Sequence, residues 1–142
     1  MKKIIFCSAL LCFTILTQAQ YKNDNVLFTT VFPQDLCREL SLQQDYVLLD
    51  VRSKGEYEDT SASPGYNLGR LKGAIHINVR ELGPRLNELR TYKDKPVFVY
   101  CSHSQRSRRA SKMLADSGFK KVFNINGGVT GLRQFYTDDC LQ

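Results

Sequence analysis

The chain has 142 residues, a formal net charge of +6 and 42% hydrophobic residues. This length fits one globular domain, and the absence of internal repeats and low-complexity segments excludes a repeat array. Apart from a basic cluster at residues 106–112, lysines and arginines are scattered, so the sequence does not indicate nucleic-acid binding.

The first residues have the pattern of a bacterial signal peptide. Two lysines precede a short apolar run at residues 4–16, and Ala19 supplies a small residue near a cleavage point. The run is short for a membrane span, which needs about 20 residues. We therefore predict a signal peptide at residues 1–19 and one exported domain at residues 20–142, periplasmic or secreted, with no membrane span after processing.

Strand-like and helix-like segments alternate along the rest of the chain. Short apolar runs predict strands at residues 26–30, 46–49, 74–78, 97–100 and 121–125. Amphipathic runs predict helices at residues 33–41, 53–59, 79–90, 106–117 and 129–136, and Gly83-Pro84 can divide the third of these into two pieces. This alternation predicts an α/β fold with a central, mainly parallel five-stranded sheet, helices on both faces, and ligands at the carboxyl ends of the strands.

Cys101 lies between a predicted buried strand and a predicted helix. A strand–loop–helix unit directs backbone N–H groups and a helix N-terminus toward the thiol, and both favour a thiolate and an anion beside it. The alternative is a buried, inert cysteine, which is common in proteins. Because the loop after Cys101 is polar and basic, we predict a reactive thiol.

Two further cysteines remain after the predicted cleavage. Cys37 lies on a predicted helix, where we expect a packed thiol, and Cys140 lies in an acidic tail, where it can pair with another cysteine that the sequence does not identify. An odd cysteine count leaves one thiol unpaired or paired with another molecule. The chain has no C-x-x-C pattern and only two histidines, so we expect neither a metal site nor a cofactor.

Four segments of the chain form an ordered set of motifs: residues 48–52 with Glu56 and Tyr57, residues 69–75, residues 101–107, and residues 123–128. In this order they resemble the motifs of the rhodanese-like sulfurtransferase domain, and the resemblance extends from residue 33 to about residue 135.

Three features depart from the family pattern. Arg70 stands where histidine is usual, and the segment between Glu56 and Gly69 is longer than usual, with residues 60–69 predicted to form a loop. Ser104 stands where glycine is common. If the loop needs a positive φ at this position, serine costs about 1 kcal/mol or more.

The resemblance implies a single-domain sulfurtransferase whose chemistry takes place at one sulfur atom. Cys101 would take sulfane sulfur from thiosulfate or a persulfide and pass it to a thiol or protein-thiol acceptor. The residues expected to contact the small anionic donor, several of them mainly through backbone N–H groups, are Ser102, His103, Ser104, Gln105, Arg106 and Ser107.

Three charged residues receive more specific expectations. Arg106 would orient the donor or stiffen the loop, whereas Asp50 and Arg52 would support the loop from beneath, because an arginine near a buried strand end needs a carboxylate or carbonyl partner. We expect the domain to act as a monomer.

Two other functions fit parts of the sequence. A non-catalytic binding module would use residues 60–69 as a contact surface. A cysteine-loop phosphatase or arsenate reductase would need five residues between cysteine and arginine, whereas four separate Cys101 from Arg106 and make a smaller cradle.

Overall fold

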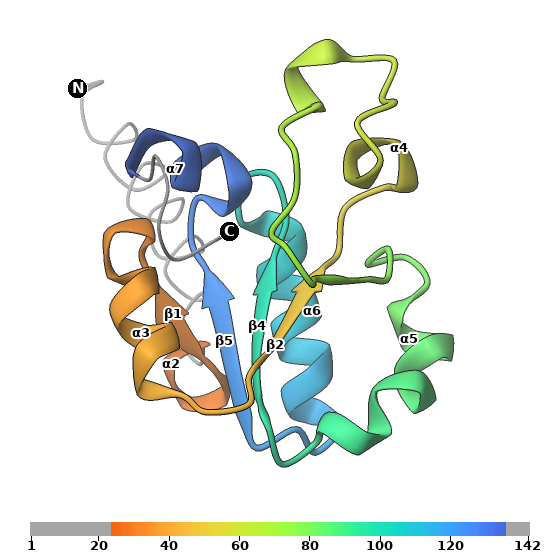
Figure 1. Cartoon of the computed structure of the whole chain (residues 1–142). Helices are drawn as coiled ribbons and strands as arrows, with labels where there is room; N and C mark the ends of the chain where they lie inside the picture. Colours follow the sequence, from red (N-terminus) through yellow and green to blue (C-terminus); the bar gives the residue numbers. More distant parts are fainter. Residues whose placement is uncertain (1–23, 136–142) are drawn as a thin grey trace, which may run out of the picture.

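The computed structural model describes residues 24–135, and its centre is a five-stranded sheet in which all paired strands are parallel (Figure 1). The strand order is β1-β5-β4-β2-β3. The strands are β1 (Thr29–Val31), β2 (Val47–Asp50), β3 (Ile75–His76), β4 (Pro96–Tyr100) and β5 (Lys121–Ile125). The predicted α/β class and five-stranded sheet are confirmed.

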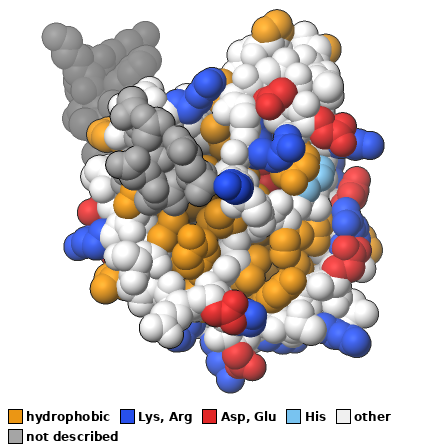
Figure 2. Space-filling model, viewed as in Figure 1, with side chains coloured by type: hydrophobic (Ala, Val, Ile, Leu, Met, Phe, Trp, Pro, Cys, Tyr) orange, Lys and Arg blue, Asp and Glu red, His pale blue; other side chains and the backbone are white. Residues whose placement is uncertain are grey.

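Helices cover both faces of this sheet, with α3 and α7 on one face and α5 and α6 on the other (Figure 1). The α-helices are α2 (Asp24–Leu27), α3 (Leu36–Leu42), α4 (Lys54–Tyr57), α5 (Leu82–Arg85), α6 (Gln105–Asp116) and α7 (Gly128–Phe135). The 3-10 helices are η1 (Pro33–Asp35), η2 (Pro64–Tyr66) and η3 (Leu86–Tyr92). On the face seen in Figure 2, charged side chains lie mainly around apolar ones near the centre.

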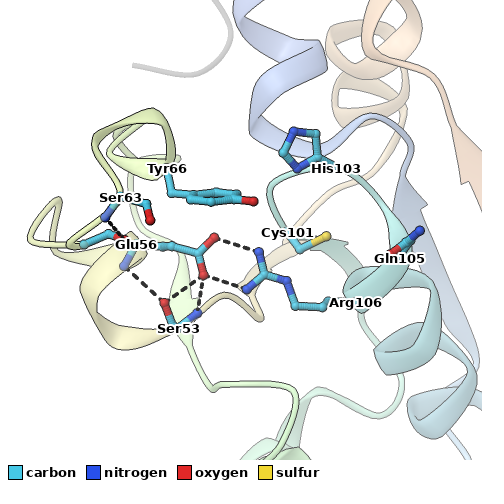
Figure 3. A pocket seen from close by; sticks show the side chains of 9 residues that line it. Ser53, Glu56, Ser63, Tyr66, Cys101, His103, Gln105 and Arg106 are labelled. Atoms are coloured by element: carbon cyan, nitrogen blue, oxygen red, sulfur yellow. Dashed lines mark hydrogen bonds and ion pairs between the residues drawn. The ribbon is translucent and has the colours of Figure 1, made fainter.

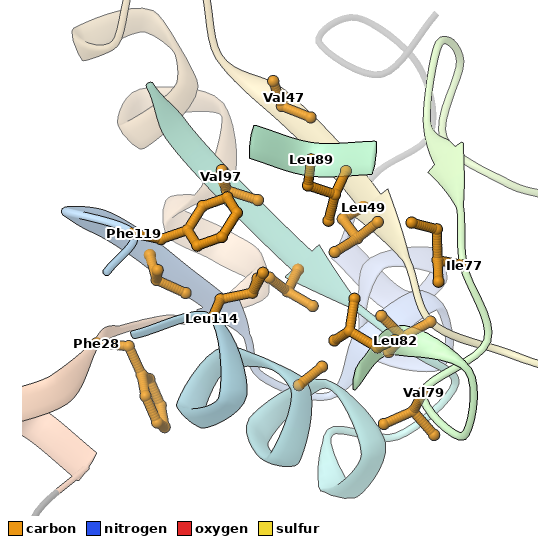
Figure 4. Close-up of a cluster of buried hydrophobic side chains, with 14 of the residues drawn as sticks. Phe28, Val47, Leu49, Ile77, Val79, Leu82, Leu89, Val97, Leu114 and Phe119 are labelled. Carbon is orange, nitrogen blue, oxygen red and sulfur yellow. The ribbon is translucent and has the colours of Figure 1, made fainter. Parts of the chain in front are cut away.

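The central strand β4 shows why the sheet is covered on both sides. Val97 and Val99 pack in one core cluster with Leu114 of α6, part of which Figure 4 shows. Phe98 and Tyr100 point the other way, into the cluster that contains residues of α3 and α7. Because side chains alternate along a strand and each buried one contributes about 1.5–3 kcal/mol, a wholly apolar strand requires helices on both faces.

One predicted strand begins later than expected, and one predicted helix is divided in two, as its Gly83-Pro84 pair allowed. The strand predicted at residues 26–30 begins only at Thr29, because Asp24 to Leu27 form a helical turn that packs against α6, where Asp24 pairs with Arg108. The helix predicted at residues 79–90 is divided into α5 and η3. Pro84 lies within α5, where a proline cannot donate the backbone hydrogen bond that a long helix needs.

The state of Cys37 also differs from the expectation. The side chain is disulfide-bonded, so the predicted packed thiol is wrong. A disulfide partner is set by the tertiary fold, and the helical position of Cys37 carried no signal for one. Within residues 24–135, Cys101 is the cysteine with a free thiol.

The predicted signal peptide and Cys140 lie outside the described residues. In the part of the chain that the structure describes, no helix combines the length and apolarity needed to cross a bilayer.

Candidate active site

Cys101 follows directly after β4, at the carboxyl edge of the sheet, and is 1% exposed. Its side chain contributes to the wall of a pocket of about 450 Å³ (Figure 3). The residues described along this pocket are Ser53, Glu56, Ser61, Ser63, Tyr66, Cys101, His103, Gln105 and Arg106. The thiol therefore lies where the parallel sheet was expected to bind a ligand.

Two polar groups of the loop contact the sulfur atom. The backbone N–H of Ser104 donates to Sγ over 3.1 Å, and the hydroxyl of Ser107 lies 3.6 Å from Sγ. The Ser107 hydroxyl donates its proton to the carbonyl of Ser104, so its oxygen is left to accept a hydrogen bond from the Cys101 thiol. The Ser104 N–H is a donor suited to a thiolate or to the sulfur of a persulfide.

Ser104 adopts a positive φ of 110°, a conformation that favours glycine, so the loop does need a positive φ at this position. Its hydroxyl donates to Asn126 Oδ1 over 2.7 Å and accepts from the Gly127 N–H over 2.6 Å. Each such hydrogen bond contributes about 1 kcal/mol, which is comparable with the conformational cost of a non-glycine residue here. The side chain thus offsets the strain that its own Cβ introduces.

The start of α7 holds the same loop through backbone hydrogen bonds. The N–H groups of Val129 and Thr130 donate to the carbonyls of Cys101 and Ser102 over 2.9 and 3.1 Å. Gly128 has a positive φ of 54°, and a Cβ at this position would lie 2.1 Å from the Cys101 carbonyl oxygen. Only glycine permits this approach, so Gly128 allows the start of α7 to pack against the cysteine loop.

Glu56 is a site residue to which the sequence analysis assigned no role. Its carboxylate accepts from both terminal nitrogens of Arg106, over 2.6 and 2.7 Å, and from the Ser102 hydroxyl over 2.7 Å. Ser53 forms a capping box with it at the start of α4. The pattern Ser53-x-x-Glu56 was the available signal, since a capping box has this spacing.

Electrostatics keeps the Glu56 carboxylate ionised. Burial alone would raise its pKa, but hydrogen bonds from Arg106, Ser102 and Ser53 outweigh burial and hold the pKa far below its ordinary value. The pKa of Arg106 is raised, mainly because the guanidinium donates to Glu56. Arg106 thus lies in the pocket wall as one half of an ion pair, and its predicted contact with a donor stays a prediction.

Asp50 and Arg52 form a second, fully buried pair beneath the site. The guanidinium contacts both carboxylate oxygens at 2.7 to 3.0 Å and donates to the Gly69 carbonyl over 2.8 Å. This pair joins the end of β2 to the far end of the long loop. The geometry fits the predicted support role, which itself stays a prediction.

The other loop residues divide into two groups. His103 and Gln105 border the pocket, whereas the side chains of Ser102 and Ser107 are buried and bond within the protein. Tyr66, from the long loop, contacts the ring of His103 edge-on with centroids 6.0 Å apart. The extended loop therefore contributes a pocket wall, which the sequence placed near the site without naming Tyr66.

The sequence of the chain is similar to those of known proteins. The chain is 40% identical over 81 residues to YqhL of Bacillus subtilis, covering 57% of this chain but only 56% of that protein. It is 32% identical over 104 residues to the thiosulfate sulfurtransferase GlpE of Glaesserella parasuis, covering 73% of this chain and 85% of that enzyme.

A solved rhodanese-related protein of Thermoplasma volcanium has the same fold, with a TM-score of 0.62 at 23% identity over 81% of this chain and 100% of that chain. The Rhodanese-like domain family matches residues 33–134, which is most of the chain and includes the whole Cys101 loop. The chain therefore belongs to the rhodanese-like domain family.

Proposed function

We propose that the chain is an exported, single-domain sulfurtransferase that moves sulfane sulfur through a persulfide on Cys101. The observation that carries the proposal is the sulfur atom of Cys101, which borders a pocket and receives the backbone N–H of Ser104 over 3.1 Å. The likeness to thiosulfate sulfurtransferase GlpE supports the same activity. Thiosulfate or a persulfide is the donor, and a thiol or protein thiol is the acceptor.

The reaction requires one nucleophile and no external base. The Cys101 thiolate attacks the outer sulfur of thiosulfate, the S–S bond breaks, and its electron pair leaves with sulfite. Cys101 then carries a persulfide, near the Ser104 N–H. An acceptor thiolate attacks the outer sulfur of this persulfide, which restores the Cys101 thiolate and completes a ping-pong cycle.

Intact-mass measurement tests the activity. The full chain is incubated with thiosulfate, and we expect one added sulfur atom that disappears when an acceptor thiol is supplied. Cys101→Ser should take up no sulfur while keeping its fold, because no other free thiol lies in the described residues. A non-catalytic binding module would show no sulfur uptake in either protein.

Export is the second part of the proposal and rests on different observations. The pattern at residues 1–19 supports it, and so does the disulfide at Cys37, since disulfides persist in oxidising compartments. Fractionation of the host cells and amino-terminal sequencing test it. We expect a chain that begins at Gln20 in the periplasm or medium, whereas an unprocessed cytoplasmic chain would contradict export.

A further inference from the structure

The charge of the pocket beside Cys101 bears on which sulfur donor can enter it. Among the described residues that line the pocket, Arg106 is the only lysine or arginine and Glu56 the only carboxylate. The nitrogens of Arg106 lie 2.6 and 2.7 Å from the carboxylate oxygens of Glu56, and Figure 3 marks this ion pair with dashed lines. The negative charge of Glu56 neutralises the positive charge of Arg106 in the pocket wall. An entering anion therefore meets no net positive charge at Arg106.

The ion pair is fixed from both sides. Ser53 holds Glu56 through the capping box, and Ser102 bridges the pair by donating to Glu56 and accepting from Arg106 over 3.1 Å. Glu56 is buried, and Arg106 is on the first turn of α6. A ligand that displaced Glu56 from Arg106 would leave the buried Glu56 carboxylate without its main partner, which is unfavourable.

Thiosulfate and an alkyl persulfide make different demands on such a pocket. Thiosulfate carries two negative charges, and its sulfonate oxygens require cations or N–H donors. An alkyl persulfide presents a slender S–S tip, and its organic group can remain toward Tyr66 and His103. Because Cys101 is 1% exposed, a slender tip suits access to its sulfur atom.

We propose that Glu56 is a specificity-determining residue, which occupies Arg106 and thereby selects small-thiol persulfides over thiosulfate. This inference rests on the sulfur transfer proposed above. The Cys101 thiolate attacks the outer sulfur of R–S–SH, and the donor's S–S bond breaks. Its electron pair leaves on R–S⁻, which takes a proton from water, while Cys101 carries –S–SH.

The experiment compares kcat/KM for thiosulfate and for 2-hydroxyethyl persulfide, whose organic group is uncharged. The wild-type chain should favour the persulfide by roughly tenfold or more, and Glu56→Gln should move the ratio toward thiosulfate by about tenfold. Glu58→Gln is the matched control. It removes a carboxylate next to the same helix that is half exposed and does not line the pocket, so the ratio should not change.

A second variant decides the question if Glu56→Gln does not fold. Ser63→Lys adds a cation at an exposed position of the pocket wall, away from the hydrogen bonds of Glu56, and should also favour thiosulfate. An unchanged donor ratio in the folded variants would overturn the role of Glu56 while leaving sulfur transfer intact. Failure of both donors to load Cys101 would instead overturn the proposed function itself.

Discussion

Glu56 and Arg106 lie fifty positions apart in the chain, yet their side chains form a two-pronged ion pair beside the Cys101 thiol. Glu56 follows β2 on the short helix α4, and Arg106 follows β4 at the start of α6. Because β2 and β4 are parallel neighbours, both residues emerge at the same edge of the sheet. The pair thus joins the long loop region to the cysteine loop.

Acid should destabilise the wild-type fold by protonating Glu56, and the Glu56→Gln variant should lack this contribution to the pH dependence of stability. The pKa of Glu56 is held below its ordinary value in the folded chain, whereas in the unfolded chain it is about 4.3. The unfolded state therefore binds the proton more readily, and the stabilisation present above about pH 4.3 is lost as the pH falls toward the folded-state pKa.

Urea unfolding at several pH values measures this difference. At neutral pH the variant should be less stable than wild type by about 1–2 kcal/mol, a value reduced because Arg106 is partly exposed. The gap should narrow as the pH falls below about 4. A stability difference between wild type and variant that stays constant down to pH 3 would show that the carboxylate charge does not stabilise the fold.

Substitution of Ser104 should separate backbone strain from hydrogen bonding. Ser104→Ala keeps the positive φ and loses the bonds to Asn126 and Gly127, so we expect a loss of about 1–3 kcal/mol. Ser104→Gly loses the same bonds but relieves the strain, and should be the more stable of the two variants. Chemical denaturation measures the order, and equal stabilities would refute the strain argument.

The close contact of Gly128 with the cysteine loop predicts a strong effect of one methyl group. In Gly128→Ala the new Cβ would meet the Cys101 carbonyl, and both are backbone-fixed, so we expect a loss of about 3 kcal/mol or more together with loss of sulfur transfer. Gly65→Ala is the control, because a Cβ there meets nothing within 4 Å. Thermal unfolding and the transfer assay measure both variants. Comparable losses of stability and activity in the two variants would show that the close contact of Gly128 with Cys101 has no specific role.

Arg106→Ala should impair the thiosulfate reaction by exposing the Glu56 carboxylate to the pocket. The Glu56 carboxylate would then repel the thiosulfate dianion, and a repulsion of about 1.5–3 kcal/mol corresponds to a roughly tenfold to hundredfold fall in kcat/KM. A persulfide donor with an uncharged organic group should suffer less. Steady-state kinetics with both donors measure the effect, and wild-type thiosulfate kinetics would leave Arg106 with no part in donor use.

The sequence allowed the sheet and the cysteine loop to be predicted because both depend on local patterns. A continuous run of apolar residues marks β4 whatever packs against it, and the spacing from Cys101 to Arg106 is read directly from the sequence. The short helix α2 was missed because four residues carry little helical signal, and its position depends on packing against α6.

The tertiary partners were harder to predict. Nothing in the residues around Arg106 indicates that its counter-ion is Glu56, since the pairing depends on the order of strands in the sheet. The disulfide state of Cys37 likewise could not be predicted from its position on a helix. By contrast, Asp50 and Arg52 are two positions apart, so their buried pair could be expected from sequence proximity.

The central claim is that Cys101 carries sulfur, and mass spectrometry of the intact chain after exposure to a sulfane-sulfur donor tests it most directly. We expect one added sulfur atom, localised to Cys101 by peptide mapping, removed by an acceptor thiol, and absent in Cys101→Ser. A folded wild-type chain that acquires no sulfur from thiosulfate or from an alkyl persulfide would contradict the assignment.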